Sequence, residues 1–184
     1  MTPTLTDATL RIENRYAVLS FDRDDVRNAL TGTALVDDIC AAIEWANNNN
    51  NLNCLILTGN GKAFSSGGNI KDMAERKGMF GGSPAELAES YRRGIQRMSR
   101  AVFHAEVPLI AAINGAAVVA GFDLACMCDL RLGNEHTVFG ETFINLGIIP
   151  GDGGAWFLQR LVDYQRAAEL TFSGRLVKAD DALS

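Results

Sequence analysis

Two glycine-rich segments of this sequence have the residue types to present free backbone N–H groups to a ligand. They lie within residues 58–70 and 114–121, and each follows an apolar run typical of a buried strand. Each also precedes a helical pattern, which predicts a turn from a strand into a helix. Small residues in such turns leave N–H groups free to face an anion. If the two strands are neighbours, these groups could converge on one oxygen as an oxyanion hole, where each donor is worth roughly 3 kcal/mol in the transition state.

Other interpretations of residues 58–70 are an ordinary surface turn, a phosphate-binding loop or a nucleophile. Glycine content alone fits the surface turn equally well. A P-loop is excluded because Ala63 follows Lys62 where Ser or Thr is required, and no G-x-G-x-x-G pattern starts at Gly59. Ser65 and Ser66 have no base at a recognisable position, so we disfavour covalent serine chemistry.

The elements that must position these turns alternate between strand and helix patterns. Strands are expected at residues 10–13, 16–21, 54–57, 109–113, 130–132 and 138–139, and helices at 33–47, 84–104, 122–128, 155–161 and 163–171. This alternation predicts βαβ units and an α/β fold, with a single domain over residues 1–184. The polar, glycine-rich residues 73–84 are expected to be a mobile segment beside the ligand.

Composition restricts the class of protein further. The chain has 184 residues, 47% hydrophobic and 21% charged, with a net charge of −5, which predicts a soluble globular protein without nucleic-acid binding. The four cysteines, Cys40, Cys54, Cys126 and Cys128, lie in apolar patterns without metal-ligand spacing. We expect buried thiols, no metal site, a cytoplasmic location and no membrane partner, since the apolar run at 109–120 is too short to span a bilayer.

Five segments carry a resemblance to a known family. Residues 63–70, 113–117, 121–129 and 146–154 resemble the signature segments of the crotonase, or enoyl-CoA hydratase/isomerase, superfamily, and residues 27–30 resemble its N-terminal Asn-Ala-Leu segment. The resemblance implies a crotonase-like spiral of βαβ units that binds an acyl-CoA thioester and stabilises its enolate. It also implies a homo-oligomer, a trimer or hexamer, and a C-terminal helical segment that is apparently absent from this chain.

The resemblance assigns roles to particular positions. The oxyanion donors are the N–H groups of Gly68 and Ala120, and the helix after Gly121 adds its positive end. Ala120 stands where family members commonly have glycine, but a backbone donor survives that change. The substrate-binding positions that it implies are Arg27, Ala29, Lys62, Ala63, Phe64, Ser66, Asn69, Ile70, Gly121 and Phe143.

The acids depart from the family pattern. Hydratases of this family use two carboxylates, one to activate water and one to exchange a proton with the α-carbon. Here the first position is Asp123, but the second is Phe143. Asp152 is a candidate replacement because related enzymes place an acid near this turn, and Glu141 is another nearby acid. Asp152 could instead cap the next helix, and Asp123 could be a solvated helix residue.

We therefore expect an acyl-CoA-processing enzyme of the hydratase/isomerase type. Asp123 would carry the chemistry with Asp152 as an auxiliary acid, which favours proton shuttling over hydration. CoA would enter as part of the substrate, without a further cofactor. The alternatives are a thioesterase, decarboxylase or dehalogenase on the same scaffold, and a noncatalytic acyl-CoA-binding protein.

Overall fold

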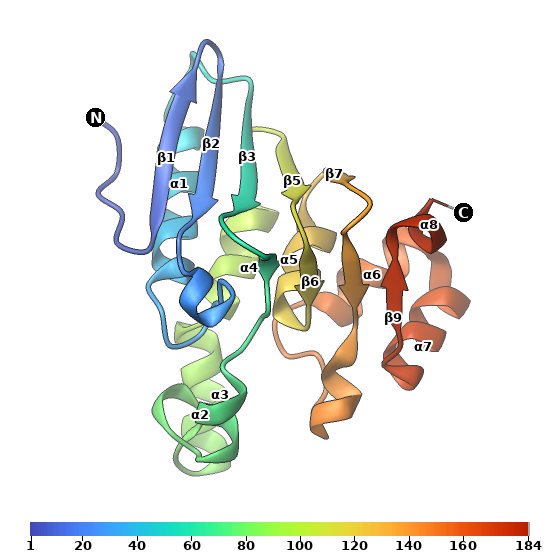
Figure 1. The fold of residues 1–184 in the computed structure, drawn as a ribbon. Helices are drawn as coiled ribbons and strands as arrows, with labels where there is room; N and C mark the ends of the chain where they lie inside the picture. Colours follow the sequence, from blue (N-terminus) through green and yellow to red (C-terminus); the bar gives the residue numbers. More distant parts are fainter. Residues whose placement is uncertain (184) are drawn as a thin grey trace.

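Two sheets of mainly parallel strands form the centre of the protein, whose computed structural model describes residues 1–183 (Figure 1). The strand order is β1-β2-β3-β5-β7 in the first sheet and β4-β6-β8-β9 in the second. The strands are β1 (Ala8–Glu13), β2 (Tyr16–Phe21), β3 (Cys54–Gly59), β4 (Ala63–Ser65), β5 (Leu109–Ile113), β6 (Ala116–Val118), β7 (Leu130–Gly133), β8 (Val138–Gly140) and β9 (Leu176–Lys178).

The helices lie mostly on one face of these strands. They are α1 (Leu35–Asn47), α2 (Ile70–Ala74), α3 (Pro84–Arg93), α4 (Gln96–Phe103), α5 (Ala120–Met127), α6 (Gly154–Leu161), α7 (Asp163–Ser173) and α8 (Ala179–Ala182). Figure 1 shows α1, α4 and α5 behind the strands, whereas α2 and α3 project from one end. None of the helices in residues 1–183 is long and apolar enough to cross a membrane.

The chain passes from the first sheet to the second three times. β3 leads into β4, β5 into β6 and β7 into β8, and each pair contributes one strand to each sheet. Within each sheet the strands of these three pairs run parallel to their neighbours. The antiparallel pairs are β1 with β2 and β8 with β9. This arrangement confirms the expected α/β spiral.

Alternating apolar positions on the strands build the core. Leu55 and Leu57 of β3 face inward and are fully buried, as are Leu19 and Phe21 of β2. From α1, buried residues at helical spacing, among them Ile39, pack against this layer. Period-two and period-3.6 patterns in the sequence therefore identify the correct buried faces.

The prediction of one long helix at residues 84–104 is wrong. It is divided into α3 and α4 at Gly94, whose backbone (φ −98°, ψ −115°) is not helical. A β-carbon at Gly94 would lie 2.7 Å from the Ser90 carbonyl oxygen, so glycine suits this bend. The bend lets α4 bury Met98 and Val102, whereas α3 has no buried residue.

Strands β4, β6 and β9 were also not expected, because three-residue strands give too little periodicity to detect.

Candidate active site

The two glycine-rich turns lie side by side. β4 pairs in parallel with β6, with Ser65 opposite Ala117, so the turns after these strands are neighbours. A β-carbon on Gly121 would lie 2.3 Å from the Ser65 carbonyl oxygen, and one on Gly67 would lie 2.7 Å from the Ala120 nitrogen. Glycine at both positions therefore permits the close backbone approach that the oxyanion-hole hypothesis requires.

Both proposed donors have free N–H groups. Among the described residues, the N–H groups of Gly68 and Ala120 have no hydrogen-bond acceptor. The next N–H along the chain, that of Asn69, is by contrast occupied by Thr31 Oγ1 at 2.7 Å. Gly68 and Ala120 line one common cavity, and Ala120 is the first residue of α5, where the helix dipole adds positive potential. The geometry of the pair thus suits an anionic oxygen.

Val119 holds the second turn in a strained conformation. Its φ of 55° and ψ of −132° are rare for a β-branched residue. Its N–H donates to Gly140 O at 2.9 Å, and its side chain lies against Gly67. Such strain persists where the surrounding structure fixes the backbone, and it is concentrated at functional sites. Nothing in the sequence indicated this residue.

The cavity beside the two donors is small and mainly apolar. Its lining is Thr31, Gly68, Met73, Met79, Phe80, Tyr91, Ile95, Val119, Ala120, Phe143, Ile148 and Asp152. Its volume of about 20 Å³ has room for about one water molecule. An acyl group needs more space, so its entry requires side chains such as Met73 and Phe80 to move. Both belong to the segment that the sequence predicts to be mobile, and that prediction stays untested.

Three buried carboxyl groups meet next to this cavity. Asp123 of α5 is 0% exposed, Glu141 after β8 is 1% exposed and Asp152 before α6 is 3% exposed. Asp123 Oδ2 accepts a hydrogen bond from the Gly154 N–H at 3.1 Å. In the described part of the chain, the other five carboxyl oxygens receive no hydrogen bond from a donor outside the three carboxyls. Because buried acceptors require donors, the carboxyls must share at least one proton among themselves.

The pKa values follow from this burial. Burial raises the pKa of Asp123 well above its ordinary value, and the charges of Asp152 and Glu141 raise it further. Burial raises the pKa of Glu141 to about 7, against a hydrogen bond from Asp123 that lowers it. Burial also raises the pKa of Asp152, and the hydrogen bond from Asp123 opposes that shift. Asp123 is therefore the neutral member, and its single O–H can be donated to Asp152 or to Glu141.

Of the three carboxyls, Asp152 is the one that lines the cavity. The loop that carries it is fixed to α4, because Ser99 Oγ donates to the Asp152 carbonyl oxygen and Gln96 Nε2 donates to Gly151 O at 2.7 Å. The Asp152 side chain does not cap α6, since Asp123 accepts the Gly154 N–H instead. A solvated Asp123 is also excluded by its complete burial. Asp152, rather than Asp123, therefore lies at the cavity, and the catalytic roles of the two acids stay predictions.

The exposed basic residues expected at the CoA site lie near each other. Arg27 and Lys62 are both exposed. Asp24 links their segments, because its carbonyl accepts the Arg27 N–H at 3.0 Å and its carboxylate accepts the Lys62 N–H at 3.0 Å. Both side chains are therefore available to a phosphate group at this surface.

Several other expected substrate-binding positions lie in the interior or take part in local packing, and their role in binding stays a prediction. Ala29, Ala63, Phe64 and Gly121 are buried, and the Phe64 ring packs against Phe21 with centroids 5.5 Å apart. Asn69 caps α2 through its side-chain oxygen. The Ser66 hydroxyl donates to Val26 O at 3.3 Å. The Ile70 side chain is 54% exposed, and Phe143 lines the site cavity.

Asn28 is a positioning residue that the sequence did not single out. It is completely buried, and its amide nitrogen donates to Ala63 O at 2.8 Å and to Asn60 O at 3.0 Å. Its side-chain oxygen accepts the Arg23 N–H at 2.9 Å. These bonds tie the N-terminal segment to the first glycine-rich turn. The sequence signal that could have identified Asn28 was the Asn-Ala-Leu segment itself, in which a polar residue precedes an apolar pair.

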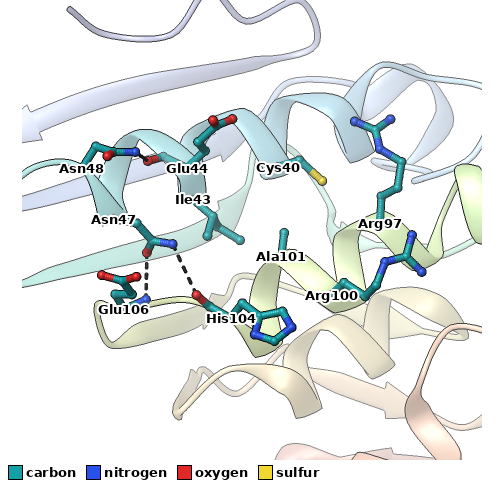
Figure 2. A pocket seen from close by; sticks show the side chains of 10 residues that line it. All are labelled: Cys40, Ile43, Glu44, Asn47, Asn48, Arg97, Arg100, Ala101, His104 and Glu106. Atoms are coloured by element: carbon teal, nitrogen blue, oxygen red, sulfur yellow. Dashed lines mark hydrogen bonds between the residues drawn. The ribbon is translucent and has the colours of Figure 1, made fainter.

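A larger cavity lies elsewhere, between α1 and α4 (Figure 2). It measures about 460 Å³ and shares no residue with the site cavity. Asn47 Nδ2 donates to His104 O at 3.3 Å, and Asn47 Oδ1 accepts the Glu106 N–H at 2.8 Å. Arg97, also in its lining, donates to Asp37. Because these polar groups are already paired, we assign the chemistry to the smaller cavity.

Paired strand-to-helix turns with two free N–H groups beside a buried acid place the chain in a class of α/β proteins whose site suits the binding of an oxyanion. The chain belongs to the enoyl-CoA hydratase/isomerase family, whose family model matches residues 11–184.

Individual relatives agree with this assignment. The chain is 34% identical over 182 residues to the short-chain-enoyl-CoA hydratase of Clostridium acetobutylicum, covering 97% of this chain and 66% of the relative. It is 34% identical over 174 residues to the crotonyl-CoA hydratase of Syntrophomonas wolfei, covering 94% and 64%. The crystal structure of enoyl-CoA hydratase from Bacillus anthracis has a TM-score of 0.85 at 31% identity, covering 96% and 66%. The chain thus spans less than two thirds of the length of the curated relatives that it matches.

Proposed function

We propose that this chain provides the oxyanion hole and the proton-transferring acid of an acyl-CoA-processing enzyme. One observation carries the proposal: the free N–H groups of Gly68 and Ala120 and the carboxyl of Asp152 line the same cavity. The names of the relatives, which are hydratases of enoyl-CoA thioesters, support the substrate class.

The arrangement suits removal of a proton from the α-carbon of a thioester. The Asp152 carboxylate forms an O–H bond as the C–H bond breaks, and the electron pair moves into the thioester as an enolate. Gly68 and Ala120 donate to the enolate oxygen, each contributing about 3 kcal/mol. Returning the proton to the γ-carbon moves the double bond. Burial raises the pKa of Asp152, and a hydrogen bond from Asp123 would oppose that shift and favour the ionised base.

Phe143 favours isomerisation over hydration, because it stands at the position of the second acid. It is 5% exposed and lines the cavity where a second acid would be needed to handle water. Hydration is the second candidate, because the relatives carry that name and the acid cluster contains more than one carboxyl. A thioesterase, decarboxylase or dehalogenase reaction would use the same oxyanion hole, and a protein that binds acyl-CoA without turnover would need neither acid.

The partners in this proposal are acyl-CoA and further copies of the chain. Arg27 and Lys62 would contact the CoA phosphates, and CoA enters as part of the substrate without a separate cofactor. A homotrimer or hexamer is supported by exposed aromatic side chains on one region, where Phe103 and Trp156 have ring centroids 5.7 Å apart and are 58% and 45% exposed. A cytoplasmic location would match the free cysteines, which suit a reducing compartment.

A panel of acyl-CoA thioesters tests the reaction class. We expect β,γ-enoyl-CoA to gain the ultraviolet absorbance of a conjugated double bond, and its α-protons to exchange with solvent deuterium. Hydration would be favoured if α,β-enoyl-CoA lost its absorbance while the α-protons of β,γ-enoyl-CoA did not exchange with solvent deuterium. Binding of acyl-CoA with neither reaction would refute the enzyme proposal.

A further inference from the structure

Glu141 has no role in the proposed reaction, yet its burial is costly. It lies between β8 and the 3-10 turn Thr142–Leu146, and within residues 1–183 neither of its carboxyl oxygens accepts a hydrogen bond from a donor other than a carboxyl. It does not line the site cavity. An unpaired buried carboxylate costs several kcal/mol, so such a residue needs an explanation.

The groups around Glu141 are acidic rather than basic. Asp123 from α5 hydrogen-bonds to it, and Asp152 from the loop before α6 acts on it through its charge. Burial raises the pKa of the Cys126 thiol, also on α5, and the charge of Glu141 nearby raises it further. The nearby cation, Arg131 of β7, donates to the Cys128 and Ala125 carbonyls rather than to Glu141. In the described chain, the hydrogen bond to Glu141 therefore comes from a carboxyl.

Asp123 is the link between the two other acids. All three carboxyls are buried, five of their six oxygens lack a non-carboxyl donor, and the single O–H of Asp123 can be donated to Asp152 or to Glu141. A chain of three carboxyls in contact can move a proton from end to end without a change in net charge. One end of this chain faces the cavity, and the other end does not.

We propose that Glu141 is a positioning residue that takes the proton of Asp123 when Asp152 has received one from the substrate. The Asp152 O–H bond breaks as Asp123 accepts that proton, and the Asp123 O–H bond breaks as Glu141 accepts the second. The net result is one proton moved from Asp152 to Glu141, with no electrons transferred. This inference rests on the proposed function, because the substrate supplies the proton.

Infrared spectroscopy of the ligand-free protein tests whether Glu141 is a proton acceptor without requiring activity. The absorbance of protonated carboxyls is followed from pH 5 to pH 9 in the wild type, in Glu141→Gln and in Glu135→Gln. We expect a band that titrates near pH 7 in the wild type, consistent with the pKa of Glu141 of about 7. It should be lost in Glu141→Gln and kept in Glu135→Gln, whose side chain is 81% exposed. A band that persists in Glu141→Gln would overturn the proposal.

Label transfer tests the relay itself, with β,γ-hexenoyl-CoA deuterated at the α-carbon as the probe. If the substrate deuteron mixes with the proton of Asp123, about half of the label or less returns to the product. Gln cannot accept a proton, so Glu141→Gln should retain about twice as much label as the wild type. Glu141→Asp, which keeps a carboxyl, should restore the wild-type value.

The outcomes separate this proposal from the proposed function. Equal label retention in the wild type and Glu141→Gln overturns the relay even if the enzyme is an isomerase. No conversion of the probe by the wild type counts against the isomerase reaction, and the infrared result then still decides whether Glu141 can take up a proton. If Glu141→Gln fails to fold, Asp123→Asn takes its place, with the same expected gain in label retention.

Discussion

Asp123 accepts the backbone N–H of Gly154 at 3.1 Å, and this single contact fastens the buried acids to the first turn of α6. The contact depends on glycine, since a β-carbon at residue 154 would lie 2.0 Å from Asp123 Oδ1. The chemistry of the site therefore depends on a residue without a side chain.

Gly154→Ala should disrupt the acid cluster. The new methyl group would displace the Asp123 carboxyl, and we expect a loss of about 1–3 kcal/mol of stability from overpacking. Exchange of substrate α-protons with solvent should fall as well. Thermal unfolding and deuterium exchange check both effects. Ala155→Ser, at the exposed next position, is the control and should change neither. Normal exchange in Gly154→Ala would show that the contact is not needed.

Asp152→Asn should remove most α-proton exchange, by about 10²- to 10⁴-fold, because the base that faces the cavity is lost. Asp123→Asn should reduce exchange by a smaller factor, since its amide can still donate to Asp152. The measurement is deuterium incorporation into acyl-CoA at equal protein concentration. The opposite order of the two variants would restore the assignment predicted from the sequence, with Asp123 as the principal acid.

Gly68→Pro should lower kcat by about 10²- to 10³-fold, because proline has no N–H to donate to the enolate oxygen. Gly68→Ala is the matched control. It introduces the same β-carbon, which would meet the flexible Met73 side-chain end at 2.3 Å, but it keeps the N–H. We expect a much smaller loss for alanine in a kcat assay. Similar losses in the two variants would point to crowding instead of hydrogen bonding.

Glu141→Gln should change how stability depends on pH. The pKa of Glu141 is raised in the folded state from an ordinary value of 4.5 to about 7, so the folded protein binds a proton that the unfolded chain has released. Its stabilising contribution is therefore complete below pH 4.5 and is lost as the pH rises to about 7. The loss is on the order of 3 kcal/mol.

Urea unfolding at pH 5 and pH 8 measures this effect. The wild type should lose more stability than Glu141→Gln between these two pH values, and Glu135→Gln should behave as the wild type does. Parallel pH profiles for Glu141→Gln and the wild type would mean that Glu141 is not buried as an acid.

Much of the local structure was predictable because it depends on nearby residues. Leu55 and Leu57 alternate with half-buried positions, and Leu35, Ile39 and Ile43 repeat at helical spacing, so β3 and α1 follow from period alone. The turn that ends in Gly68 could be predicted in the same way, from glycines between a strand pattern and a helix start. The break at Gly94 was missed, because one glycine inside a helical pattern does not by itself show whether the helix bends.

The sequence by itself determined the strand-to-helix turns, the α/β class and the candidate acids, because each depends on residue type and short-range spacing. Tertiary structure alone decided how these acids are used. Asp123 and Asp152 are 29 positions apart, and Glu141 lies on a third segment, so no periodicity indicates that they meet. Their contact depends on how α5, β8 and α6 pack. Which carboxyl faces the cavity, and which holds the proton, follow from burial that only the packed chain creates.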